Sequence, residues 1–439
     1  MTARLRQLLD QLAEKFWLIP ALLVLAGVAV AVGLIELDRS ELIPRWLLER
    51  WLYDGGATGA RTLLGAIASS TIGVAGTVFS ITIAALSLAA GQMGPRLLRN
   101  FTRDRGNQFT LGIFLGTFCY ALMVLRSVRT ETEGSGFVPH LSLSVGIVLA
   151  FVCVATLVYF VGHMAGRINV DTVIELVSDD IHAAIRRLTT DERQPEPPPL
   201  TFWRDATPIT DDRRGYLQQL DEHGLAAWAG EHETAIRLLV RPGDYVFPGA
   251  PIALMLPPVE GADVAVRDAT ALGPQRAGSS DLRFAVRQLV EVAVRALSPG
   301  INDPHTAVSV LDRLGAVLCE MKPLHLPTGV RFAHQRPVLV VPHVQYDQLL
   351  NTMFHMIRQN AAGNATVLMR QLEVLTQVVS CERDRVRMAA LKRHADLVLG
   401  DAERDIATPG DLEDLRRRHR AFVTTMIDGP LAQFAASPT

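Results

Sequence analysis

The residue pattern best suited to chemistry is a run of small and hydroxyl-bearing side chains between residues 69 and 87. These side chains recur every three or four positions, so a single α-helix would carry them as one stripe. In a pore, such hydroxyl groups replace part of the hydration shell of an ion. The same residue types also let two helices pack closely and hydrogen-bond across the contact, which is the alternative interpretation. The candidate pore-lining residues are Ser69, Gly73, Gly76, Thr77, Ser80 and Ser87.

Polar and basic residues follow this stripe in the sequence. Gln92 comes first, and Pro95 then suits the first turn of a short amphipathic helix that carries Arg96 and Arg99. Arginines at such a position commonly anchor to lipid headgroups with their side chains extended along the membrane surface. We therefore interpret Gln92, Arg96 and Arg99 as residues of a cytoplasmic pore mouth or of a headgroup contact.

A second candidate site lies in the segment SPGINDPHTA, residues 298–307. Proline and glycine end the preceding helix, Asp303 can cap the next helix, and Pro304 suits its first position. This structural interpretation explains every residue of the segment except His305. The functional alternative is a small ligand site at the helix N-terminus, formed by Asn302, Asp303 and His305.

Several classes of function lack support in the sequence. The net charge is −2 and no long block of Lys and Arg occurs, so we do not expect a nucleic-acid partner. There is no GxSxG, Walker or HExxH motif, and the histidines do not show paired ligand spacing. We therefore predict no enzyme activity, no catalytic residues, no metal site and no cofactor. The cysteines form no CxxC pair and are expected to be small buried hydrophobic residues: Cys119, Cys153, Cys319 and Cys381.

Four apolar runs, at residues 16–37, 63–90, 109–128 and 141–161, have about the 20-residue length that a helix needs to cross a bilayer. They predict a four-helix transmembrane domain over residues 1–163, with the lipid bilayer as its surroundings. No acidic or basic residue lies in the middle of any run, which disfavours proton-coupled carriers but permits a passive pore. We expect His163, at the end of the fourth run, to lie at the membrane interface.

The distribution of arginine indicates the orientation. Basic residues precede the first run, lie between the second and third, and follow the fourth, which predicts that these segments are cytoplasmic. An even number of spans then places both termini on that side. We therefore expect a multi-pass protein of the inner membrane with cytoplasmic N- and C-termini.

The remaining chain has the composition of a water-soluble domain. A helical extension and a proline-rich linker are predicted over residues 164–200, a small β-rich lobe over 201–275, and a mainly helical domain over 276–439. The order of strands and turns before residue 256 resembles half of a biotinyl/lipoyl-type sandwich. No lysine is available there for a covalently attached cofactor. The predicted fold class is thus α-helical integral membrane protein plus a cytoplasmic α+β domain.

Four segments resemble one family of bacterial proteins. They are TVFSITIAALSLAAGQMGPRLL at residues 77–98, GYLQQLD at 215–221, RPGDYVFPG at 241–249 and ALSPGINDPHTA at 296–307. Together they look like the predicted membrane proteins grouped as domain of unknown function 2254. The resemblance implies an inner-membrane location and the two-part architecture, and it brings no catalytic residue with it.

Two hypotheses follow. In the first, several copies form a homo-oligomeric ion channel lined by the second span, with the cytoplasmic domain as a regulator. In the second, the spans only anchor a regulatory or scaffold module whose soluble domain binds a partner protein or a small ligand. The pore predicts that Ser69, Ser80 and Ser87 face a common axis, whereas the anchor predicts that they are buried against other helices of the same subunit.

Overall fold

A computed structural model of the protein describes residues 16–40, 56–93, 104–130, 136–167, 170–274, 276 and 282–430. The chain divides into two compact units, which we call the N-terminal unit (Leu9–Thr172) and the C-terminal unit (Val173–Thr439).

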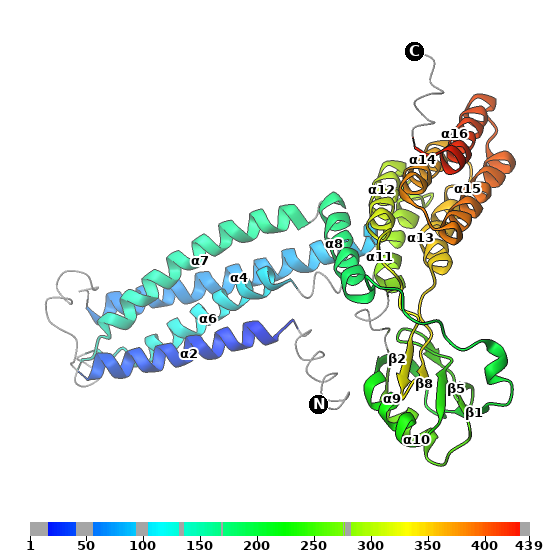
Figure 1. Ribbon diagram of the computed structural model, residues 1–439. Coiled ribbons are helices and arrows are strands. Elements are labelled where there is room, and N and C mark those ends of the chain that lie inside the picture. The colour runs from blue at the N-terminus through cyan, green and yellow to red at the C-terminus, as the bar shows by residue number, and fades with distance from the viewer. Residues whose placement is uncertain are drawn as a thin grey trace. The chain divides into compact units, whose positions relative to one another are not determined.

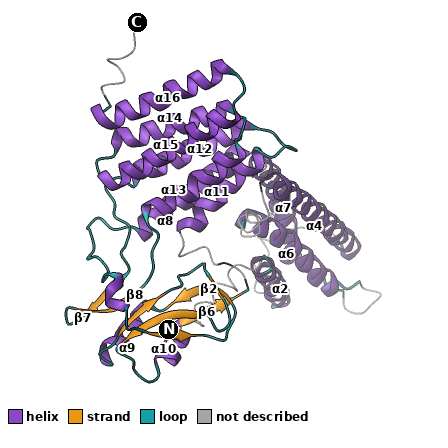
Figure 2. Ribbon diagram, turned by 90° about the vertical axis from the view of Figure 1, so that its right-hand side faces the viewer, coloured by secondary structure: helices purple, strands orange, loops and turns teal. Residues whose placement is uncertain are grey.

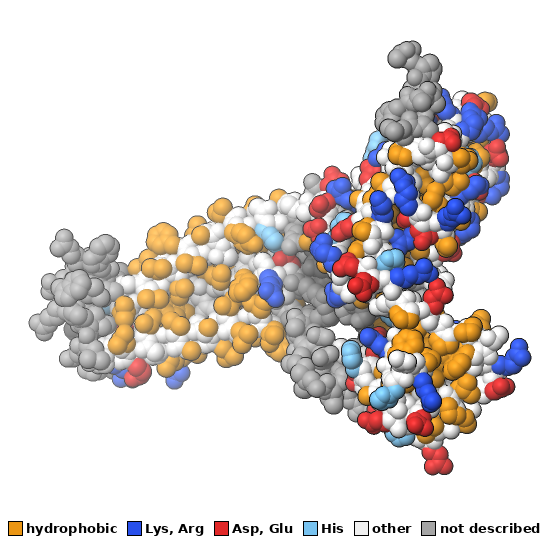
Figure 3. All heavy atoms as spheres, in the orientation of Figure 1, with side chains coloured by type: hydrophobic (Ala, Val, Ile, Leu, Met, Phe, Trp, Pro, Cys, Tyr) orange, Lys and Arg blue, Asp and Glu red, His pale blue; other side chains and the backbone are white. Residues whose placement is uncertain are grey.

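Four long helices lie side by side in the N-terminal unit (Figure 1). Each of them is long and apolar enough to cross a membrane, which confirms the four predicted apolar helices. Hydrophobic side chains cover much of the face of these helices that is seen in Figure 3. Such a surface suits contact with lipid rather than with water. The helices are α2 (Leu18–Arg39), α4 (Ala57–Met93), α6 (Arg105–Ser127) and α7 (His140–Arg167).

Helix α6 is central to this unit because it packs against α2, α4 and α7. Its contact with α2 is close, since glycines leave the backbone bare on both sides. A Cβ atom added at Gly116 would lie 2.9 Å from the carbonyl oxygen of Leu23, and one added at Gly27 would lie 2.5 Å from the carbonyl oxygen of Gly116. Gly112, one turn before Gly116, faces α2 in the same way. This GxxxG spacing is a common device for close packing between membrane helices.

The C-terminal unit begins within α8 (Val170–Leu188), at Val173, and then forms a lobe of strands, drawn in orange in Figure 2. One sheet has the strand order β1-β5-β3-β8-β7, in which β3 and β8 run parallel and the other pairs are antiparallel. A second sheet has the order β4-β2-β6. The strands are β1 (Thr207–Thr210), β2 (Gly215–Leu220), β3 (Ala235–Leu238), β4 (Tyr245–Val246), β5 (Pro251–Leu256), β6 (Thr270–Gly273), β7 (Val330–Ala333) and β8 (Arg336–Val340).

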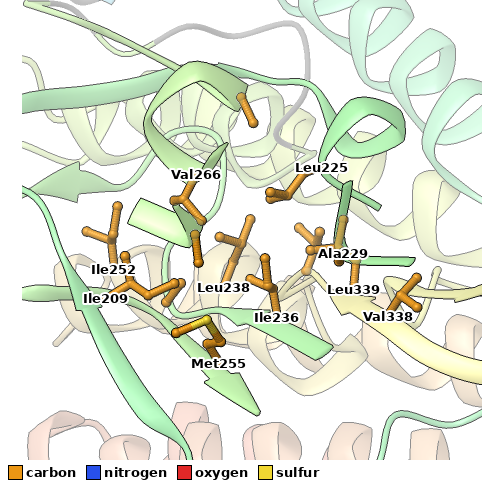
Figure 4. Close-up of a cluster of buried hydrophobic side chains, with 14 of the residues drawn as sticks. Ile209, Leu225, Ala229, Ile236, Leu238, Ile252, Met255, Val266, Val338 and Leu339 are labelled. Atoms are coloured by element: carbon orange, nitrogen blue, oxygen red, sulfur yellow. The ribbon is translucent and has the colours of Figure 1, made fainter. Parts of the chain in front are cut away.

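The sheet topology corrects two expectations. The β-rich lobe is not confined to residues 201–275, because β7 and β8 return from beyond residue 330 to complete the larger sheet. The lobe is also not half of a lipoyl-type sandwich, since helices pack into its core. That core joins one side of the sheet to α9 (Glu222–Glu231) and α10 (Ala262–Ala269), and Figure 4 shows its side chains pointing toward one another. Long-range pairing of this kind leaves no periodic signal in the local sequence.

The rest of the unit is helical, as predicted. The short η3 (Leu200–Trp203) precedes the lobe. Arginines of the last helix form ion pairs within the unit. Arg416 binds Glu403 and Arg418 binds Glu373, at N–O distances of 2.9 and 2.8 Å. The helices are α11 (Leu282–Ala296), α12 (Pro304–Glu320), α13 (Tyr346–Asn360), α14 (Ala365–Cys381), α15 (Arg385–Asp405) and α16 (Pro409–Asp428).

The hairpin between β7 and β8 turns through His334 and Gln335, whose φ angles are +48° and +65°. A two-residue hairpin loop with positive φ at both positions normally uses Asn, Asp or Gly, because most other residues are strained there. Each such residue costs roughly 1–2 kcal/mol relative to a right-handed conformation.

We expect Gly116→Val to destabilise the N-terminal unit by about 1–3 kcal/mol, because its new side chain meets backbone atoms of α2 that cannot move aside. The measurement is the thermal unfolding of the purified protein in detergent. Gly65→Val is the matched control, since a Cβ atom at Gly65 of α4 meets nothing within 4 Å. Equal destabilisation by both variants would show that the α2–α6 contact is not the cause.

We expect Gln335→Gly to raise the free energy of unfolding by about 1 kcal/mol, because glycine adopts a φ of +65° without strain. Chemical denaturation followed by tryptophan fluorescence measures the change. The control is Gln345→Gly, at a position whose φ is −85°, where the same substitution relieves no strain. A loss of stability in Gln335→Gly would contradict the strain assigned to this turn.

Candidate functional site

The candidate pore-lining residues lie on the face of α4 that points away from the other helices of the N-terminal unit. The opposite face, which includes Leu64, Thr71 and Val78, is buried. Ser80 follows Thr71 by nine residues, which is about two and a half turns of helix and so places it on the other side. All the candidates are exposed: Ser69, Gly73, Gly76, Thr77, Ser80 and Ser87.

Three hydroxyl groups of this exposed stripe donate hydrogen bonds to carbonyl oxygens of their own helix. Ser80 donates to Gly76 at 2.9 Å, and Thr77 donates to Gly73 at 3.2 Å. Ser69 donates to Ala66 at 3.2 Å. A hydroxyl group also has two acceptor lone pairs, so each oxygen atom remains able to face a cation or to accept a hydrogen bond.

The glycines of the stripe are not used for packing within the subunit. A Cβ atom added at Gly73 or Gly76 would meet nothing within 4 Å, in contrast to Gly112 and Gly116 of α6. The close packing that small residues permit is therefore found between α2 and α6. The anchor hypothesis expected Ser69, Ser80 and Ser87 to be buried in their own subunit, and this expectation is not met.

The candidate mouth residues are only partly covered by the structure. Gln92 belongs to the last turn of α4, which ends at Met93. Arg96 and Arg99 lie outside the described residues. Their assignment to a pore mouth or to headgroups stays a prediction.

A hydrogen-bonded contact between side chains at the ends of two spans was not predicted. The Nε2 atom of His163 lies 2.7 Å from a carboxylate oxygen of Asp104, and the side chains are 18% and 3% exposed. The same carboxylate caps α6 by accepting a hydrogen bond from the N–H of Gly106 at 2.9 Å. His163, predicted to lie at the membrane interface, is therefore a partner in a partly buried pair. An aspartate before an apolar run is a capping signal, but its partner 59 residues later cannot be read from the sequence.

The second candidate site, at residues 298–307, is a capped turn. Asn302 adopts a φ of +49°, and Asp303 accepts hydrogen bonds from the N–H groups of His305 and Thr306 at 3.1 and 3.2 Å. The hydroxyl of Thr306 donates to the same carboxylate at 2.6 Å. Because Asp303 occupies the N-terminus of α12, an anion would have to displace it. His305 is exposed beside the turn.

Among the described residues, no group of three or more His, Cys, Asp and Glu side chains could hold a metal ion.

Comparison with known proteins supports the reading of the chain as a membrane protein. The family model described as "Predicted membrane protein (DUF2254)" matches residues 13–377. The chain belongs to the DUF2254 family. DUF2254 relatives include uncharacterized proteins of Mycobacterium tuberculosis (strain CDC 1551 / Oshkosh) and Mycobacterium bovis (strain ATCC BAA-935 / AF2122/97). Each is 31% identical over 94% of this chain and 80% of the relative. No solved structure matches.

We expect Asp303→Ala to lower stability by about 1 kcal/mol, because α12 loses its capping carboxylate. The hydroxyl of Thr306, more than any other group, holds the pKa of Asp303 below its usual value of 3.8. A lowered pKa means that the carboxylate stabilises the fold fully above its unfolded pKa, and that this contribution disappears as the pH falls through the lower folded pKa.

Denaturation of wild type and Asp303→Ala over a range of pH measures this difference. It should be constant near neutral pH and shrink below pH 3.8. Asp303→Asn is the control, since its amide oxygen can cap the helix at every pH. A difference between wild type and Asp303→Ala that persists unchanged in acid would show that the carboxylate charge is not involved.

Proposed function

We propose that this DUF2254 protein forms a homo-oligomeric channel of the inner membrane, in which α4 of each subunit lines the conduction path. The observation that carries the proposal is the exposure of the hydroxyl and glycine stripe, from Ser69 to Ser87, on the face of α4 that its own subunit leaves uncovered. In this arrangement the C-terminal unit is cytoplasmic and regulates the channel.

The physical argument concerns what covers this face. An exposed stripe of small residues lets the α4 helices of other copies approach closely, and the hydroxyl oxygens then line the space between them. Helix α4 has 37 residues, so at 1.5 Å per residue it is about 55 Å long, against a hydrocarbon core of about 30 Å. A helix of this length also supports a path that continues beyond the membrane.

Conduction in this channel is passive. Within the described parts of the four spans, acidic, basic and histidine side chains occur only near helix ends, as Asp104 and His163 do. Carriers coupled to protons generally need such groups inside the membrane. The hydroxyl stripe supplies oxygen atoms for a hydrated or partly dehydrated ion without a fixed charge.

Single-channel recording from purified protein in a planar bilayer tests the proposal. We expect discrete openings in wild type that shrink or vanish in Ser80→Leu and Ser87→Leu, because a leucine removes the hydroxyl oxygen and narrows the path. Thr156→Leu is the matched control. Its hydroxyl on α7 also bonds to its own helix, at 2.7 Å from the oxygen of Val152, but it lies outside the stripe.

The opposite results are equally informative. Currents that are unchanged in both serine variants would remove α4 from the path. A silent bilayer, from protein shown to be folded and oligomeric, would overturn the channel and favour the alternative of an anchored regulatory module.

A further inference from the structure

A cavity of about 520 Å³ lies at one end of the larger sheet in the C-terminal unit. Strands β3 and β8 begin there, at Ala235 and Arg336, while β5 and β7 end there, at Leu256 and Ala333. A volume between roughly 300 and 1,000 Å³ is typical of sites for small molecules. Apolar side chains form most of its wall, including Phe202, Leu256, Pro257 and Val338. Val338 lies at one margin of the core cluster in Figure 4.

The backbone is strained around this cavity. Four non-glycine residues have positive φ angles in the described part of the chain, and two of them, Glu233 and His334, line the cavity. A third, Gln335, is the next residue along the hairpin. Strained residues of this kind often occur at ligand sites, where the side chain is needed despite its conformational cost. Here Glu233 and His334 adopt this costly conformation at the cavity.

The rim also carries opposite charges that do not neutralise each other. Glu233 and Arg336 both line the cavity and are exposed, and neither makes an ion pair within 4 Å among the described residues. Nearby Arg331, in contrast, binds Glu222 at 3.0 Å. The cavity thus offers one anionic group, one cationic group and an apolar wall.

We infer that this cavity binds a small zwitterion with an apolar side chain, namely a hydrophobic amino acid. Its carboxylate binds the guanidinium of Arg336, which suits the planar, two-pronged geometry of that pair. Its ammonium group binds Glu233, and its side chain lies against Phe202, Leu256 and Val338. The site is independent of the proposed conduction path and makes the C-terminal unit a sensor of such a ligand.

Isothermal titration calorimetry of the full-length protein in detergent tests the site. The probes are L-phenylalanine, 3-phenylpropanoate, which lacks the ammonium group, and phenethylamine, which lacks the carboxylate. We expect L-phenylalanine to bind, and each analogue to bind at least about tenfold more weakly, because each loses one charged hydrogen-bonding partner.

Two rim variants assign the charges. Arg336→Gln should weaken L-phenylalanine about tenfold and leave phenethylamine unchanged, whereas Glu233→Gln should weaken L-phenylalanine and leave 3-phenylpropanoate unchanged. Arg204→Gln, an exposed arginine of the same lobe outside the cavity wall, is the control and should bind as wild type. Because all three side chains are exposed, the variants should fold, and thermal unfolding checks this.

Three results would overturn the inference. They are no binding of L-phenylalanine, L-leucine or L-tryptophan, equal binding of L-phenylalanine and both analogues, and unchanged binding in both rim variants. The titration involves no conductance, so its failure leaves the channel proposal standing, and a silent bilayer leaves the cavity standing.

Discussion

The need to pair every backbone N–H and C=O without help from water governs the N-terminal unit. In hydrocarbon an unpaired peptide group is so costly that each apolar run must form a helix, and helices can then approach only where side chains are small. Gly27, Gly112 and Gly116 provide that approach between α2 and α6. Because α6 also packs against α4 and α7, the contact between α2 and α6 joins α2 to the helix that all the others contact.

The same constraint applies to the exposed face of α4, which carries glycines and hydroxyl groups. The glycines of two spans differ in their use, because Gly112 and Gly116 of α6 meet α2 closely, whereas a Cβ atom added at Gly73 or Gly76 of α4 would meet nothing within 4 Å. The glycines of α4 are exposed together with hydroxyl groups that bond to their own helix, so this face is stable in an apolar environment and still presents oxygen atoms. A surface of this kind suits both contact between copies and contact with ions.

The C-terminal unit follows a different rule, since burial of apolar area in water holds it together. Its lobe takes strands from two distant stretches of chain, and the parallel pair of β3 and β8 connects them. The ends of these strands and the strained hairpin at His334 enclose the cavity whose rim bears Glu233 and Arg336. A lobe built from distant segments can thus bring together charges that share no local pattern.

From the sequence alone, the four apolar helices, the largely helical remainder with some strands, the cap at Asp303 and the DUF2254 resemblance could be predicted. These depend on local signals, namely run length, helical period and turn chemistry. The tertiary structure alone decided which face of α4 is left uncovered, that Asp104 meets His163, and that β7 and β8 complete the sheet. Each of these depends on residues far apart in the chain, whose pairing is set by packing and burial and leaves no trace in local spacing.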